Sequence, residues 1–220
     1  WMEQKQSLNW GKRKKELEKL LEQNRSKTGG YDCIVPVSGG KDGSYVAYQL
    51  RSKYKMNPLT VTVRPALEME IGDNNLKEFV NSGFDHLHIT PNHEVMKELN
   101  KYGFIEKGFP YYGWLTAIHT AVLRVAVNFG VNLIFYGEDG EVEYGGSDET
   151  KNVATYNTSY QRRVYLEDGY NKLLKKLKFD DSQLYFFRYP ENKEDEKIVL
   201  THWSYFEAWD SYRNYVVAKE

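Results

Sequence analysis

The sequence predicts an α/β fold, an open parallel sheet flanked by helices. Short β-rich runs alternate with helical patterns, and strands that are separated by helices pair in parallel through crossover connections. The first β-rich run ends in a glycine-rich turn that leads directly into a helix, an arrangement typical of phosphate binding at the carboxyl edge of such a sheet. The four β-rich runs cover residues 31–37, 57–63, 86–90 and 132–137.

Helical patterns precede and separate these runs. Residues 9–25 carry Leu17, Leu20 and Leu21 on one apolar face, with Asn9 as the expected N-cap. Further helices are expected at residues 45–53, 74–82, 93–101 and 114–129.

The helix expected at residues 114–129 is apolar on most faces, so it should be well buried. Four polar residues at intervals of four form one stripe along it: Thr116, Thr120, Arg124 and Asn128. Arg124 either pairs with an internal carboxylate or faces phosphate, and the sequence leaves both alternatives open. His119, beside the stripe, is expected to be a hydrogen-bonded structural residue and not a catalyst.

The glycine-rich turn covers residues 38–44 and reads Ser-Gly-Gly-Lys-Asp-Gly-Ser. Gly39 and Gly40 permit backbone conformations and a close approach that a Cβ would block, and the free N–H groups of the first helical turn point at an anion above them. The turn is not a Walker A loop, because Val35 stands where that pattern needs glycine and Asp42 stands where it needs Ser or Thr.

A second glycine-flanked loop, residues 137–146, follows the fourth β-rich run. It holds four carboxylates within six positions, which is costly to arrange without a cation. Glu138 stands where the chain leaves the strand, placed to orient a nucleophile or to take its proton. The end of the second run, around Thr62, is a natural shelf for an adenine ring.

The composition excludes several classes of protein. Thirty basic and thirty-one acidic side chains give a net charge of −1, so no overall field draws the protein onto nucleic acid. The single cysteine, Cys33, lies in an expected core strand and is interpreted as a small buried residue. No apolar run reaches the ~18 residues of a membrane span. We therefore expect a cytoplasmic protein.

The Ser-Gly-Gly-Lys-Asp motif at residues 38–42 resembles the pyrophosphate-binding loop of the PP-loop ATP pyrophosphatases, an architecture also called adenine nucleotide α-hydrolase-like. The resemblance implies that ATP is cut between its α and β phosphates and that AMP is placed on a substrate oxygen. Most members carry Ser where this chain has Gly43, so Ser38 and Ser44 remain to supply a hydroxyl to phosphate. The acidic loop resembles that of asparagine synthetases, which implies that it helps to hold magnesium.

Residues 1–150 more broadly resemble the N-acetyl sugar amidotransferases of bacterial surface-polysaccharide (O-antigen) and flagellin-sugar pathways. The segments 32–47, 55–63 and 133–146 carry this resemblance. It implies conversion of an acetamido group into an acetamidino group, with ATP and Mg²⁺ as cofactors. It also implies an N-acetyl sugar substrate, nucleotide-activated, and ammonia from a separate glutaminase subunit. Full-length members carry paired cysteines ahead of this region, so we expect the chain to be part of a longer protein.

These motifs and resemblances together assign roles to individual residues. The residues expected to act in catalysis are Lys41, Asp42 and Glu138. Those expected to bind magnesium are Asp42 and Glu141. ATP binding falls to Val37, Ser38, Gly39, Gly40, Lys41, Asp42, Gly43, Ser44, Thr62 and Gly137. The aromatic segment 104–114 is expected to form a lid or a sugar-facing wall. Residues 151–220 are expected to form an aromatic-rich helical segment facing substrate or a partner.

Two other functions share the same loop. A tRNA-modifying adenylase would need a basic face and, for thiolation, reactive cysteines, and the composition offers neither. A module that binds ATP without turnover would not need a second, metal-ready acidic loop.

Overall fold

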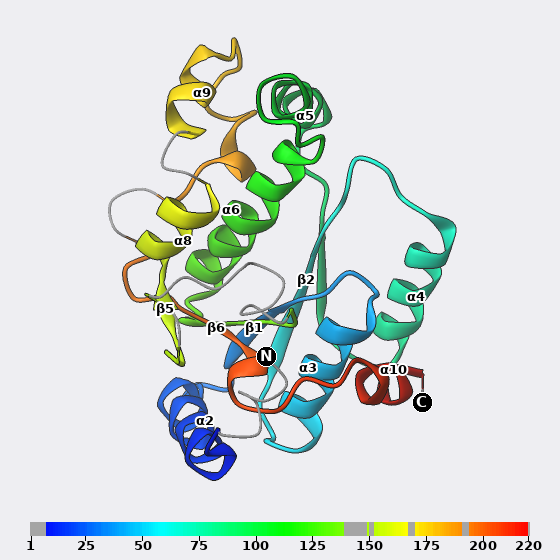
Figure 1. Cartoon of the computed structure of the whole chain (residues 1–220), viewed down its shortest axis with the longest axis vertical. Coiled ribbons are helices and arrows are strands. Elements are labelled where there is room, and N and C mark those ends of the chain that lie inside the picture. The colour runs from blue at the N-terminus through cyan, green and yellow to red at the C-terminus, as the bar shows by residue number, and fades with distance from the viewer. Residues whose placement is uncertain (1–7, 139–148, 150–151, 167–169, 191–193, 220) are drawn as a thin grey trace.

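The computed structural model of the chain describes residues 8–138, 149, 152–166, 170–190 and 194–219. In this part of the chain, one six-stranded sheet in the order β3-β2-β1-β4-β6-β5 carries helices on both faces (Figure 1). Only β5 pairs antiparallel, and the other strands pair in parallel. This confirms the predicted α/β fold. The strands are β1 (Cys33–Pro36), β2 (Pro58–Val63), β3 (His86–Ile89), β4 (Leu133–Tyr136), β5 (Tyr156–Asn157) and β6 (Val199–His202).

Each face of the sheet has its own hydrophobic core, because alternate residues of a strand point to opposite faces. In β1, Cys33 and Val35 pack toward one face and Ile34 toward the other. The first face is covered by α2 (Trp10–Asn24), α3 (Lys41–Ser52), α4 (Glu70–Asn81) and α10 (Ser211–Lys219). The second is covered by α5 (His93–Lys107), α6 (Tyr112–Phe129), α8 (Thr158–Tyr165) and α9 (Tyr170–Lys176).

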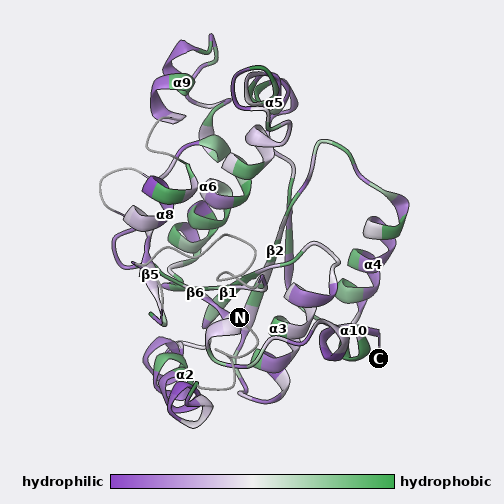
Figure 2. Ribbon diagram, in the orientation of Figure 1, coloured by the Kyte–Doolittle hydropathy of each residue, from purple (hydrophilic) through white to green (hydrophobic). Residues whose placement is uncertain are grey.

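The hydropathy of the ribbon follows this layering. Figure 2 shows hydrophobic residues along the central strands and along α6, with hydrophilic ones toward the outside of α2. Two short 3-10 turns, η1 (Tyr185–Phe187) and η2 (Trp203–Tyr205), add aromatic side chains to the two cores. None of the helices described is long and apolar enough to cross a bilayer.

The four predicted strands and the five predicted helices are all present. Four helices are longer than expected: α3 begins at Lys41, inside the glycine-rich turn, α4 begins at Glu70, α6 begins at Tyr112, and α5 runs on to Lys107. The prediction missed β5 and β6, which come from the segment expected to be helical. The run Val199–His202 lies beside β4, and Leu200 and Thr201 are completely buried there. Residues 151–220 therefore contribute strands to the same sheet that carries the glycine-rich turn at residues 38–44.

Both alternatives for Arg124 are wrong. Its guanidinium donates hydrogen bonds to the backbone carbonyls of Tyr185, Arg188 and Tyr189 at 3.0–3.2 Å. Among the described residues it pairs with no carboxylate, and it does not line the pocket beside the glycine-rich turn. It also lies over the Tyr185 ring, 4.4 Å from its centroid. Arg124 thus fastens the η1 segment onto α6, because an arginine with several donors can satisfy carbonyls that helix and sheet leave open.

Candidate functional site

The shape of the glycine-rich turn at residues 38–44, called the phosphate turn from here on, depends on glycine. Gly39 has φ +75°, and a Cβ there would lie 2.8 Å from both the Gly72 carbonyl oxygen and the Leu76 nitrogen. Conformation and space therefore both require glycine at this position. Gly40 is the extended N-cap residue of α3, with φ −78° and ψ 158°. The first N–H groups of α3 are thus presented beyond the end of β1, where the helix dipole favours an anion.

The loop after β4 packs directly on the start of α3. A Cβ on Gly137 would lie 2.6 Å from the Gly43 nitrogen, and a Cβ on Gly43 would lie 2.8 Å from the Pro36 carbonyl oxygen. Two backbones touch here with no side chain between them. The departure from the PP-loop pattern at Gly43 therefore has a packing cause, since a serine at this position would not fit without moving the loop.

The two serines of the turn differ in placement. Ser44 donates its hydroxyl hydrogen bond to the Gly40 carbonyl oxygen at 2.9 Å, within the first turn of α3. Ser38 is exposed and lines the pocket described below. Of the two hydroxyls expected to meet phosphate, only that of Ser38 faces the pocket.

Lys41 and Asp42 form an ion pair in the first turn of α3. The Lys41 Nζ lies 2.8 Å from Asp42 Oδ2, and Asp42 Oδ1 accepts a hydrogen bond from Asn214 Nδ2 at 3.0 Å. Asn214 is fully buried on α10, and its own oxygen accepts hydrogen bonds from the Arg213 guanidinium. Because the guanidinium only donates, the Asn214 amide must turn its NH₂ toward Asp42. The C-terminal helix therefore fixes the orientation of this carboxylate.

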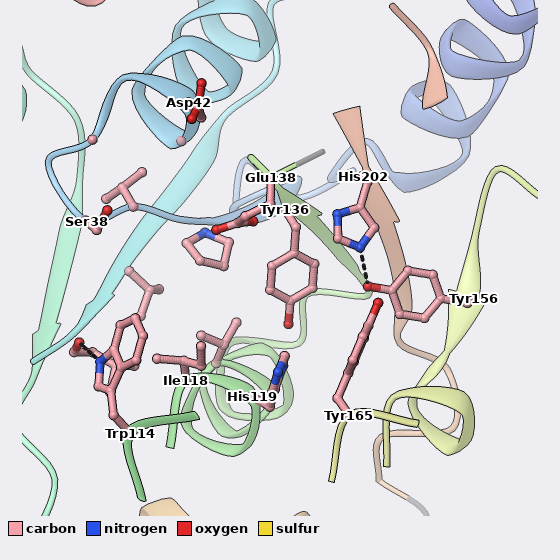
Figure 3. A pocket seen from close by; sticks show the side chains of 17 residues that line it. Ser38, Asp42, Trp114, Ile118, His119, Tyr136, Glu138, Tyr156, Tyr165 and His202 are labelled. Carbon is pink, nitrogen blue, oxygen red and sulfur yellow. Dashed lines mark hydrogen bonds between the residues drawn. The ribbon is translucent and has the colours of Figure 1, made fainter. Parts of the chain in front are cut away.

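A pocket of about 160 Å³ opens beside the phosphate turn (Figure 3). It lies at the carboxyl ends of β1, β2, β4 and β6, next to the point where strand order reverses between β1 and β4, which is the usual ligand position in open α/β sheets. Of the predicted site residues, Val37, Ser38, Gly40, Asp42, Gly43 and Glu138 line it. The others, Gly39, Lys41, Ser44, Thr62 and Gly137, lie around the turn without lining the pocket.

The end of β2 forms an apolar side of the pocket. Thr62 is buried and donates its hydroxyl to the Val37 carbonyl oxygen at 2.6 Å, so its side chain points away from the pocket. Its neighbours Val61 and Val63 line the pocket instead, because side chains alternate along a strand. Trp114 joins them and donates its indole N–H to the Val63 carbonyl oxygen at 3.2 Å.

Of the aromatic segment expected to form a lid, only Trp114 lines the pocket. Phe104 lies on α5 and is 67% exposed, and Tyr111 is 49% exposed. The two helices α5 and α6 take up most of this segment, so its aromatic side chains are spread over a helical hairpin and do not form one wall.

The opposite wall of the pocket consists of aromatic rings and imidazoles. His119 stacks on Tyr165 at 5.3 Å with an interplanar angle of 4°, and His202 stacks on Tyr156 at 5.6 Å. The Tyr156 hydroxyl and His202 Nε2 are hydrogen-bonded at 2.9 Å (Figure 3). Burial lowers the pKa of His119 to about 3 and that of His202 to about 4. Both imidazoles are therefore neutral near pH 7, and burial also raises the pKa of Tyr136 beside them.

The two predicted magnesium ligands are Asp42 and Glu141. Glu141, the predicted magnesium ligand, lies outside the described residues, and within the described part of the chain no group of three His, Cys, Asp or Glu side chains is arranged around a metal position. Magnesium at phosphate sites is commonly held by one or two carboxylates together with substrate phosphates and waters. Asp42, at the edge of the pocket beside the helix start, fits that role.

The C-terminal part of the chain brings residues to the site that were not expected there. Tyr156, Tyr165 and His202 come from β5, α8 and β6, and Asn214 comes from α10. A signal existed for β6, because residues 198–201 read Ile-Val-Leu-Thr and three of the four are β-branched, which is a strand pattern. No sequence pattern links Asn214 to Asp42, since only the docking of α10 on α3 brings them together.

No family model matches the chain. The curated protein "Uncharacterized protein MJ1599" of Methanocaldococcus jannaschii is 44% identical over 55 residues, which cover 25% of this chain and 20% of that protein. The chain therefore spans about a fifth of the length of the curated relative that it matches.

Solved structures with a distant likeness include the U34-tRNA thiolase NcsA of Methanococcus maripaludis with its 4Fe-4S cluster, at 14% identity and a TM-score of 0.48 over 93% of this chain and 62% of that one. They also include an NH3-dependent NAD synthetase of Campylobacter jejuni, at 15% identity and a TM-score of 0.45 over 82% and 92%. An NMN synthetase of Francisella tularensis has 13% identity and a TM-score of 0.40 over 63% and 59%. All three TM-scores fall short of one half, a likeness too limited to establish a shared activity.

Proposed function

We propose that the chain is an ATP-dependent enzyme that transfers AMP to a substrate oxygen and releases pyrophosphate. The observation that carries the proposal is the glycine turn at the start of α3, held by backbone-to-backbone packing and opening onto a pocket at the strand ends. The triphosphate lies over the first N–H groups of α3, and the adenine ring lies against Val61, Val63 and Trp114. A Lys and a carboxylate stand in the first helical turn beside it.

In this proposal the role of each group follows from its charge. The backbone N–H groups at residues 39–44 and the Lys41 ammonium hold the outer phosphates and stabilise the negative charge that grows on the departing pyrophosphate. Asp42 holds magnesium, which offsets the same charge when bound. No protein nucleophile is needed, so most of the rate gain comes from positioning and electrostatics. Glu138, which lines the pocket, is placed to take a proton from the attacking group.

The finer proposal is an N-acetyl sugar amidotransferase. The acetamido oxygen attacks the α phosphate of ATP, which forms an O-adenylated imidate and releases pyrophosphate. Ammonia then adds to the imidate carbon, and AMP leaves with the former acetamido oxygen, which gives the acetamidino sugar. The sequence resemblance supports this choice, and the aromatic wall supports it as well, since rings suit the C–H faces of a sugar and exclude water from the adenylated intermediate.

The nitrogen source in this proposal is a separate glutaminase subunit. Cys33 is completely buried in β1, and burial raises the pKa of its thiol, so it is not the accessible thiolate that a glutaminase nucleophile requires. The sugar is proposed to serve an O-antigen or related surface-polysaccharide pathway.

A substrate panel tests this function. The protein is incubated with ATP, Mg²⁺, ammonium and N-acetyl sugars in free and nucleotide-activated form, and AMP, ADP and pyrophosphate are quantified. We expect AMP and pyrophosphate in equal amounts, dependent on an N-acetyl sugar. Formation of ADP would reject nucleotidyl transfer. Formation of AMP with unmodified tRNA in place of a sugar would keep nucleotidyl transfer and reject the sugar substrate.

Glu141→Ala is expected to abolish most turnover in the same assay, because Glu141 is the second proposed magnesium ligand.

A further inference from the structure

Three buried polar side chains form a network beside the pocket, away from the phosphate turn. Gln161 on α8 is fully buried, His119 on α6 is 6% exposed, and Tyr136 at the end of β4 is 7% exposed. The Gln161 Nε2 lies 3.0 Å from His119 Nδ1 and 2.9 Å from the Tyr136 hydroxyl oxygen. The Gln161 Oε1 accepts a hydrogen bond from the Tyr189 hydroxyl at 3.3 Å. The mechanism proposed above uses none of these groups.

The direction of each hydrogen bond in this network follows from the Gln161 amide. Its oxygen is occupied by the Tyr189 hydroxyl, so its two N–H bonds are given to His119 Nδ1 and to the Tyr136 oxygen. An Nδ1 that accepts belongs to the neutral tautomer with its hydrogen on Nε2. A Tyr136 oxygen that accepts keeps its own hydrogen for another partner. With Gln161 donating to both neighbours, the His119 Nε2–H and the Tyr136 O–H can each donate to a different partner.

Both donors belong to the pocket. His119 and Tyr136 line it, and in Figure 3 the two side chains lie together in its centre, between the end with Ser38 and Trp114 and the end with Tyr156 and Tyr165. Among the described residues no acceptor is found for the His119 Nε2–H or for the Tyr136 O–H. Because both residues line the pocket, an oxygen atom of a ligand bound there can accept these two hydrogen bonds.

We propose that the His119 Nε2–H and the Tyr136 O–H form a two-donor subsite for an uncharged oxygen of the acceptor substrate, a hydroxyl or carbonyl oxygen of an uncharged sugar derivative. This inference rests on the proposed function and names the part of the pocket that selects the second substrate.

The charges around the subsite define this substrate class. Glu138 lines the same pocket and its negative charge acts on Tyr136, so a phosphate or carboxylate is disfavoured near the donors. The low pKa of His119 keeps the imidazole neutral, so it offers a hydrogen bond without a positive charge. The flat face of Tyr165 stacked on His119 adds an apolar surface for the C–H groups of a pyranose ring.

A matched pair of variants tests the subsite. Tyr136→Phe and Tyr45→Phe each remove one buried hydroxyl that donates or accepts a hydrogen bond, but only Tyr136 belongs to the Gln161 network and lines this pocket. Binding of N-acetylglucosamine and of its 1-phosphate is measured by ligand-observed NMR in the presence of a non-hydrolysable ATP analogue. We expect about tenfold weaker binding of the uncharged sugar to Tyr136→Phe, as for the loss of one neutral hydrogen bond, and a change of less than about twofold for Tyr45→Phe. The wild-type protein should prefer the uncharged sugar to its phosphate.

A second measurement does not depend on how the variants fold. The ¹⁵N chemical shifts of His119 report its tautomer, which should be Nε2–H at neutral pH, and the Nε2–H signal should shift when N-acetylglucosamine is added. Equal losses in the two variants, an Nδ1–H tautomer, or a preference for the phosphorylated sugar would each overturn the subsite. AMP formation is scored separately. Sugar binding that is weakened only in Tyr136→Phe would support the subsite even if no AMP forms, whereas AMP formation with equal binding in all proteins would support the proposed function alone.

Discussion

The two ends of the pocket are built in opposite ways. The phosphate end is made from contiguous residues and from backbone, with Gly39, Gly43 and Gly137 packed too closely for any side chain. The aromatic end is made from side chains that α6, β4, β5, α8 and β6 bring together, and its two imidazoles are neutral near pH 7. The first end suits a ligand with a fixed, highly charged shape, and the second suits an uncharged one. The difference separates general ATP chemistry from the choice of acceptor.

The charge of the phosphate end gives the largest expected effect. Lys41→Ala should lower AMP formation by about 10²–10³-fold, because it removes a cation that stabilises charge developing in the transition state. Lys53→Ala, at the other end of α3, is the matched control and should retain normal turnover. Initial rates of pyrophosphate release measure both variants. A Lys41→Ala enzyme with near-normal rates would remove this residue from the site.

The neutrality of the aromatic end should be visible in the pH dependence of stability. The pKa of His119 is lowered from 6.5 to about 3, so between these values the unfolded chain binds a proton that the folded protein does not. The free energy of unfolding therefore falls as pH falls below about 6.5. The part of this loss that is due to His119 reaches about 3 kcal/mol near pH 4.

Urea unfolding at neutral pH and near pH 4 measures this contribution of His119 to the free energy of unfolding. His119→Gln should show a weaker loss of stability on acidification than the wild type, whereas His93→Gln, at an exposed position of α5, should lose as much as the wild type. An unchanged slope in His119→Gln would mean that the imidazole is charged or solvated in the folded protein, and the contrast between the two ends would fail.

The backbone contact at the phosphate end can be broken by one methyl group. Gly137→Ala places a Cβ against the Gly43 nitrogen, and such overpacking should cost about 1–3 kcal/mol of stability. Because the contact cannot relax without moving the start of α3, affinity for ATP should fall as well. Gly72→Ala is the control, since a Cβ there meets nothing within 4 Å. Thermal melts and calorimetric titration with Mg·ATP should separate the two variants, and a Gly137→Ala protein that binds ATP normally would contradict this account of the loop.

The smallest expected effect tests the link between the C-terminal helix and the loop. Asn214→Leu removes the hydrogen bond to Asp42 while keeping the volume of the side chain, and the net loss should be about 1 kcal/mol. If Asn214 positions a magnesium-holding carboxylate, the Mg²⁺ concentration for half-maximal AMP formation should rise several-fold. Tyr212→Leu, at a 75% exposed position of α10, should leave it unchanged. A uniform loss of rate without a change in Mg²⁺ dependence would assign Asn214 a purely structural role.

The same contrast explains what could be predicted from the sequence. The turn at residues 38–44 was predictable because its residues are adjacent and their glycines are required by local geometry. Gly137 and Glu138 were predictable because parallel strands end at one edge of the sheet. His202 and Tyr156 were not, since they depend on a strand inserted beside β4 from a segment rich in aromatic residues. Arg124 was misjudged because its partners are backbone carbonyls of η1 and the following residues, which leave no trace in residue type.

The fate of the acetamido oxygen tests the central claim most directly. An N-acetyl sugar labelled with ¹⁸O in its acetamido carbonyl is converted in the presence of ATP, Mg²⁺ and ammonium, and the products are analysed by mass spectrometry. Nucleotidyl transfer to that oxygen predicts one ¹⁸O atom in the phosphate of AMP and none in pyrophosphate. Label in inorganic phosphate accompanied by ADP, or label retained in the sugar while AMP forms, would contradict the account.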